Sequence, residues 1–194
     1  MPERSLRSTF ASIAIWAVFA VYPVLVWLGL AHESPRAVAI GLLCVLVPVL
    51  AYAIRRNGLG ATSTMVLIPL LTVGAILMSA VFDDASWLYA EPVVISVCLL
   101  LLFGATLRRG AMPMIERFAR LQESHLSPPQ QAWCRLWTWI WCTFFVVNGT
   151  TSAVLAMAAP LQWWVVYTTG IVYAVMGCLF ATEWWLRRRR FGRG

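Results

Sequence analysis

Residues 127–148 read SPPQQAWCRLWTWIWCTFFVVN and combine helix-start chemistry with an unusual density of tryptophan. Ser127 and Gln130 have the spacing of a capping box. Pro128 and Pro129 fit the first turn of a helix, where a backbone N–H has no intrahelical partner anyway. The stretch therefore predicts a helix that begins near residue 127, ahead of a bilayer, and continues to about residue 158.

Three tryptophans of this stretch recur every four residues and therefore share one stripe of the helix, namely Trp133, Trp137 and Trp141. Indole joins an apolar body to one N–H donor, so it favours the headgroup boundary of a bilayer. An interfacial belt combined with helix packing is the simplest interpretation. Trp141 lies deeper than a belt requires, so an aromatic groove for a lipid-like ligand is the alternative. Asn148 is predicted to face the same neighbours as Trp141, as a contact of that groove or of a partner helix.

The composition is that of an integral membrane protein. Of the 194 residues, 61% are hydrophobic and only 12% are charged, whereas soluble domains are about half apolar and about a quarter charged. One soluble core could not bury so much apolar surface. All basic residues are arginines in short groups at the ends of apolar runs, a placement that sets membrane topology and argues against nucleic acid as a partner.

Six apolar segments are predicted to cross the bilayer as helices. Their lengths suit about 30 Å of hydrocarbon at a rise of about 1.5 Å per residue. They comprise residues 10–31, 37–54, 65–82, 92–107, 136–158 and 163–186. The sequence therefore predicts an all-α, polytopic membrane protein with a single integral domain.

Charge asymmetry predicts that both termini are cytoplasmic. Arg36 is the only arginine outside the two termini and the loops after the second and fourth segments. The positive-inside rule therefore places both termini and the 108–135 loop in the cytoplasm. The opposite loops carry the titratable residues His32, Asp83, Asp84 and Glu91. These four form a candidate polar site on the outer face, although loop solvation and charge asymmetry are the simpler explanation.

The 108–135 loop contains a shorter helical pattern. Its apolar residues share one helical face, namely Met114, Ile115, Phe118 and Leu121. Glu116 and Arg120 are four residues apart and pair on the polar side. This predicts a short amphipathic helix on the inner leaflet, with a docking helix for a partner protein as the alternative.

No motif in the sequence assigns a catalytic activity. HExxH, GxSxG, Walker and CxxC patterns do not occur, and the five cysteines have no neighbouring histidine. The centres of the six segments carry no ionisable side chain, whereas proton relays and ion-coupled carriers place one there. We therefore expect no cofactor or metal, and favour a non-catalytic protein over an enzyme. Lipid, other membrane proteins or a second copy of the chain are the expected partners.

A series of residues between Pro113 and Asn148 follows the order found in a known family. The series comprises Pro113, Ile115, Arg117, Pro128, Trp133, Leu136, Trp141, Phe144 and Phe145, and Trp164, Val165, Tyr167 and Gly170 extend it. In these positions the chain resembles the intracellular septation protein A family of bacterial inner-membrane proteins. It departs from that family at Trp137 and Thr168, where the family tends to have Asn and Lys.

The chain is also similar to a sister group of membrane proteins from aryl polyene and xanthomonadin-type pigment gene clusters. Resemblance to the septation family implies a non-catalytic protein that supports envelope biogenesis, elongation or division through partners. Resemblance to the sister group implies an accessory component of polyene pigment synthesis, acting in transport or in a lipid-linked step. The sequence leaves both alternatives open.

Overall fold

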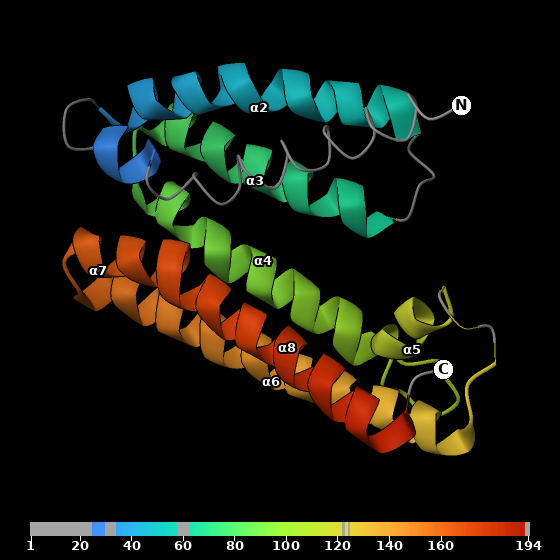
Figure 1. The fold of residues 1–194 in the computed structure, drawn as a ribbon. Helices are drawn as coiled ribbons and strands as arrows, with labels where there is room; N and C mark the ends of the chain where they lie inside the picture. Colours follow the sequence, from blue (N-terminus) through green and yellow to red (C-terminus); the bar gives the residue numbers. More distant parts are fainter. Residues whose placement is uncertain (1–24, 30–33, 58–62, 122, 124, 193–194) are drawn as a thin grey trace. The chain divides into compact units, whose positions relative to one another are not determined.

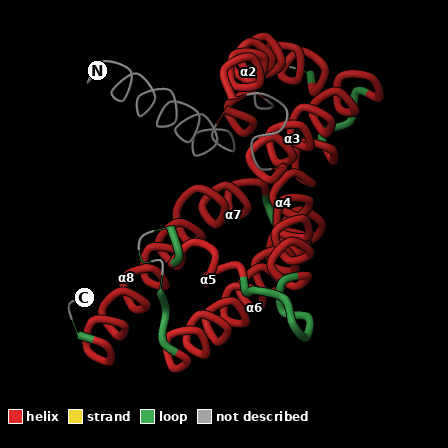
Figure 2. The backbone as a smooth tube through the Cα atoms, turned by 90° about the vertical axis from the view of Figure 1, so that its right-hand side faces the viewer, coloured by secondary structure: helices red, strands yellow, loops and turns green. Residues whose placement is uncertain are grey.

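A computed structural model describes residues 25–29, 34–57, 63–121, 123 and 125–192 (Figure 1). These residues form helices and connecting loops, and none of them belongs to a strand (Figure 2). After a helical stretch at 25–29, the elements are α2 Pro35–Asn57, α3 Ser63–Phe82, α4 Ser86–Ala105, α5 Met114–Ala119, α6 Pro128–Ala158, α7 Leu161–Val166, the π-helical turn Tyr167–Ile171 and α8 Val172–Phe191. Most of the first predicted segment, and His32, lie outside the described residues.

Among the described residues, three helices are long and apolar enough to cross a membrane. They are Ser86–Ala105, Pro128–Ala158 and Leu161–Phe191, with 20, 31 and 31 residues. Shorter apolar helices cover Pro35–Pro48 and Leu70–Phe82. Large apolar side chains point outward from the longer helices, as a lipid environment requires. For the described residues, the prediction of an all-helical protein with helices long and apolar enough to cross a membrane is confirmed.

The fourth predicted segment, 92–107, has the wrong start. α4 begins at Ser86, and Pro92 lies inside the helix. Asp84 accounts for the earlier start, because its Oδ1 accepts a hydrogen bond from the backbone N–H of Ser86 at 2.8 Å. This is the bond that an N-terminal capping side chain makes. Glu91 is consequently a helix residue, and its predicted place in an outer loop is wrong.

The last predicted segment, 163–186, contains a break in its α-helical register. A π-helical turn over Tyr167–Ile171 separates α7 from α8. The Oγ1 atoms of Thr168 and Thr169 donate to the carbonyls of Trp164 and Val165 at 2.8 and 2.6 Å. These threonine hydroxyls therefore donate to backbone carbonyls next to the π-helical turn, where the α-helical hydrogen-bond pattern is interrupted.

The chain divides into two compact units, each of which is described on its own. Unit 1 contains the residues up to Glu91 and Leu155–Gly170, and unit 2 contains Pro92–Val154 and the residues from Ile171 onward. In unit 1, α2 and α3 lie side by side (Figure 1). Their shared core is aliphatic and comprises Val26, Ala39, Leu42, Leu46, Val73, Ile76 and Leu88.

Hydrogen bonds at the start of α2 tie it to the end of α3. Asp83 adopts a left-handed φ of 54°, which ends α3. Its Oδ1 accepts from the backbone N–H of Arg36 at 2.9 Å. The Arg36 side chain donates from Nε to the carbonyl of Ala80, also at 2.9 Å. The one arginine that departs from the predicted charge asymmetry thus has a structural role at a helix end.

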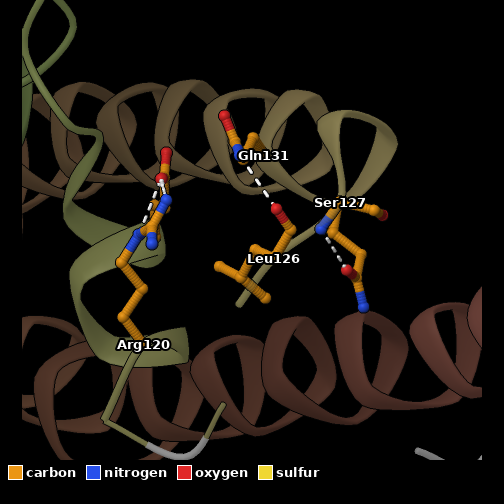
Figure 3. A network of polar contacts seen from close by, with 6 residues as sticks. Arg120, Leu126, Ser127 and Gln131 are labelled. Atoms are coloured by element: carbon orange, nitrogen blue, oxygen red, sulfur yellow. Dashed lines mark hydrogen bonds and ion pairs between the residues drawn. The ribbon is translucent and has the colours of Figure 1, made fainter. Parts of the chain in front are cut away.

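In unit 2, α5 packs against the start of α6. Ala119, Leu126 and Cys134 form a small buried cluster, with Ile115 packed against it. The capping box predicted at the start of α6 is formed on its Gln130 side, since Gln130 Oε1 accepts from the backbone N–H of Ser127 at 2.7 Å (Figure 3). The helix therefore starts where its sequence indicates.

The amphipathic helix of the 108–135 loop is shorter than its pattern indicates, and its orientation differs. α5 has six residues, and Glu116 on it is buried although it was expected on the polar, solvent side. Arg120 explains this burial, because its Nη2 lies 2.7 Å from Glu116 Oε1 and neutralises the carboxylate (Figure 3). Phe118 and Leu121 are 54% and 82% exposed, so part of the apolar face points away from the protein.

Candidate functional site

The tryptophan stripe of α6 faces the interior of unit 2. Trp133, Trp137 and Trp141 are 9%, 3% and 6% exposed, whereas the neighbouring Trp139 is 57% exposed. A belt at the headgroup boundary needs rings on the lipid-facing surface. Of the four tryptophans in this stretch, only Trp139 is exposed enough for such a belt. The three tryptophans of the stripe are buried and pack between helices.

The stripe joins α6 to α8. The ring of Trp141 lies 4.8 Å from that of Phe180, and the ring of Trp133 lies 6.0 Å from that of Phe191. Trp133 Nε1 also donates to Glu183 Oε1 at 3.3 Å. We call this set of contacts, with Trp137 between its two ends, the α6–α8 aromatic seam.

Trp137 is the one member of the seam with a buried, unsatisfied donor. Its ring lies 5.9 Å from that of Trp133. Its Nε1 is buried and has no hydrogen-bond partner among the described residues. A buried donor without an acceptor costs about 1–3 kcal/mol. This N–H is therefore the point of the seam at which an acceptor from a ligand or another chain would be most favourable.

Asn148 faces α4 rather than the seam. Its Nδ2 donates to Ser96 Oγ at 2.9 Å, and Ser96 Oγ donates to the carbonyl of Pro92 at 2.7 Å. Gly149 makes this approach possible, because a Cβ at that position would lie 3.1 Å from the Cβ of Ser96. The Asn148 amide thus bonds to Ser96 of α4, whereas the ring of Trp141 contacts Phe180 of α8.

The three candidate outer-face residues that the structure describes, Asp83, Asp84 and Glu91, each have a separate partner. Asp83 binds the backbone of Arg36, and Asp84 binds the start of α4. The hydrogen bond from the Ser86 backbone lowers the pKa of Asp84. Glu91 is buried in α4, where its Oε1 accepts from Thr72 Oγ1 of α3 at 3.2 Å. Across the part of the chain that the structure describes, no group of three or more His, Cys, Asp or Glu residues is arranged to hold a metal.

An open hollow of about 460 Å³ lies beside α5 and was not predicted. Its walls are Gly110, Ala111, Met112, Pro113, Glu116, Pro128, Gln131, Ala132 and Arg135. Arg135 Nη2 donates to the carbonyl of Leu107, and Gln131 Nε2 donates to that of Leu126 at 2.9 Å (Figure 3). These two hydrogen bonds hold the side chains of Arg135 and Gln131 in place along the hollow. No sequence signal marks the hollow, because two separate stretches form it only after α5 folds against α6.

No family model matches the chain, and neither a curated protein nor a solved structure matches it. What the structure defines is an α-helical protein with three helices that could cross a membrane. The resemblance of residues 113–148 to the septation protein family remains a prediction.

Proposed function

We infer that the chain is a six-span protein of the bacterial inner membrane, with both termini cytoplasmic, that supports envelope biogenesis through protein partners. The observation that carries this proposal is the α6–α8 aromatic seam. Trp133 and Trp141, two of the residues predicted to line a ligand groove, contact Glu183 and Phe180 within the same unit. Side chains occupied in this way hold helices together, and they favour a scaffold over a carrier or an enzyme.

The distribution of charge supports the membrane topology. Arg187–Arg190 follow the apolar part of α8, and Arg108 and Arg109 follow α4. Asp83 and Asp84 lie in the turn between α3 and α4. Under the positive-inside rule, this alternation of basic and acidic ends favours a cytoplasmic C-terminus.

Reporter fusions test the topology directly. Fusions after Asn57, Gln122 and Gly194 are expected to report the cytoplasm. Fusions within 32–36, 83–85 and 160–162 are expected to report the periplasm. A periplasmic signal from the C-terminal fusion would contradict the six-span proposal.

Depletion in the source bacterium tests the role in the envelope. The expected result is elongated or misdivided cells, together with in vivo cross-links from this chain to other envelope proteins. Purified protein in liposomes is the complementary test. Vectorial transport of a defined solute would contradict a scaffold role.

The unpartnered Trp137 N–H favours a second candidate, an accessory component for polyene pigments. In this candidate, an ester or carboxyl oxygen of a conjugated, lipid-like chain accepts from this buried donor. Ketosynthase, acyl carrier protein and acyltransferase genes beside this one would support the candidate, whereas division or elongation genes would support the first proposal. In a binding assay with an aryl polyene ester, Trp137→Phe should weaken binding, and unchanged binding would argue against the groove.

A further inference from the structure

The four consecutive arginines at the end of α8 divide into two pairs with different surroundings. Arg187 and Arg190 face other protein groups. Arg187 Nη1 lies 3.8 Å from Glu183 Oε1, and the same carboxylate accepts from Trp133 Nε1. Arg190 Cζ lies 5.5 Å from the centre of the Trp133 ring. This inner pair therefore belongs to the α6–α8 aromatic seam.

Arg188 and Arg189 are exposed and rest on tryptophans of their own helix. Arg188 Cζ lies 4.3 Å from the centre of the Trp184 ring, and Arg189 Cζ lies 3.7 Å from that of Trp185. The two indoles are 56% and 47% exposed. Each outer arginine thus stacks on a ring four residues earlier, and both members of each pair are open to the surroundings.

Stacking leaves the binding edge of each guanidinium free. The ring covers one face of the planar group, while the N–H donors lie in its plane and match the oxygens of a phosphate. The indole gives the same pair an apolar surface that favours the bilayer boundary. Four residues of helix correspond to about 6 Å, so the backbone of each tryptophan lies one turn nearer the hydrocarbon than that of its arginine. The arginine side chain reaches back over the ring, so the guanidinium and the indole together form one polar and apolar surface at the end of the helix.

We propose that the Arg188–Trp184 and Arg189–Trp185 pairs are two binding sites for the headgroups of anionic phospholipids in the leaflet where α8 ends. Each guanidinium binds a lipid phosphate, and each indole lies against the glycerol and upper acyl chain. Arg187 and Arg190 instead stabilise the contact between α6 and α8. The proposal rests on the membrane placement of α8, but it does not depend on the envelope role.

Charge complementarity favours an anionic lipid over a zwitterionic one. The two outer arginines, Arg188 and Arg189, are both exposed in the last turn of the helix. The nearest acidic side chain on α8, Glu183, is engaged by Trp133 and Arg187. The amine of a zwitterionic headgroup would add a positive charge beside these arginines, whereas the headgroup of phosphatidylglycerol adds none.

Lipid retention by the full-length protein tests the proposal. Purified protein is equilibrated in mild detergent with equal amounts of phosphatidylglycerol and phosphatidylcholine, and the retained lipids are counted by native mass spectrometry. The wild type is expected to retain phosphatidylglycerol preferentially. In Arg188→Gln/Arg189→Gln that preference should fall by roughly tenfold or more.

A matched variant separates specific sites from total charge. Arg187→Gln/Arg190→Gln removes the same charge and should keep most of the preference while lowering thermal stability. Trp184→Leu/Trp185→Leu keeps every charge, and its preference should also fall because the stacking rings are gone. Equal losses in the two arginine variants, with no loss in the tryptophan variant, would overturn the sites in favour of a diffuse basic patch.

Three further outcomes would each show which part of the proposal is wrong. Excess inorganic phosphate, at an ionic strength matched with chloride, should not displace the retained lipid, and displacement would mean that the pairs bind soluble anions. Equal retention of both lipids by the wild type would overturn the headgroup sites alone. Retention of neither lipid would overturn these sites together with the membrane placement of α8.

Discussion

The two compact units hold their helices together by different means. The core of unit 1 between α2 and α3 is aliphatic, and its polar bonds run from Arg36 to the end of α3 and from Thr72 to Glu91. Unit 2 uses large rings between α6 and α8 and a side-chain amide between α6 and α4. Lipid is as apolar as leucine, so helices associate in a membrane through close packing and hydrogen bonds. The contact between α6 and α8 therefore depends on a few large rings, whereas the contact between α2 and α3 depends on many aliphatic side chains.

The largest effect should come from removing a ring of the seam. Trp141→Ala deletes a buried side chain that contacts Phe180, and we expect a loss of about 3 kcal/mol in unfolding free energy. Trp139→Ala is the matched control, because its ring is exposed and its loss should change stability little. Titration with sodium dodecyl sulfate in mixed micelles measures both variants. Equal losses would show that the seam is no tighter than the lipid-facing surface.

A smaller loss is expected when the approach of α6 to α4 is blocked. Gly149→Val places a branched side chain where even a Cβ would lie 3.1 Å from Ser96 Cβ. Overpacking of this kind costs about 1–3 kcal/mol. Gly177→Val on α8 is the control, because an added Cβ there meets nothing within 4 Å. The comparison fails if both valines have the same effect on the unfolding midpoint.

The polar pair between α6 and α4 should show a modest coupling. A double-mutant cycle of Asn148→Ala and Ser96→Ala is expected to give about 0.6 kcal/mol, and at most about 1.7 kcal/mol. Trp141→Phe and Asn148→Ala should be additive, because the two residues contact different helices. Coupling between Trp141 and Asn148 that exceeds the coupling of Asn148 to Ser96 would reverse the assignment of neighbours.

The smallest effect concerns the exposed start of α4. The pKa of Asp84 is lowered by the Ser86 N–H, so this bond stabilises the folded state above the unfolded pKa of about 4. The stabilisation is lost as the pH falls through the lower, folded pKa. Asp84→Asn keeps a capping oxygen and should remove that part of the pH dependence. Thermal midpoints measured across the acid range test this, and an unchanged profile would contradict it.

The helices were predictable from the sequence because apolar runs of this length have few alternatives. The orientation of the tryptophan stripe was not predictable, since rings spaced by four residues look the same on a belt and in a seam. Exposure separates them in the structure, with Trp137 at 3% and Trp139 at 57%.

The prediction that this helix begins at residue 92 was wrong for a related reason. Glu91-Pro92 resembles a helix start, because proline is favoured at the first helical position. Asp84 is an earlier helix-start signal, because its carboxylate accepts from the backbone N–H of Ser86. The helix therefore begins at Ser86 and includes Glu91. Two local signals competed, and the partner that Glu91 finds in Thr72 is distant in the sequence.

Cross-linking in the membrane tests the aromatic seam most directly. In a cysteine-free background, Trp141→Cys/Phe180→Cys should join α6 to α8 with a short thiol-to-thiol reagent, because these rings are 4.8 Å apart. Trp139→Cys/Phe180→Cys should not react, because Trp139 points out of the unit. A high yield for the 141–180 pair and none for the 139–180 pair is the predicted result. The reverse yields would show that the stripe faces the lipid and would contradict the account.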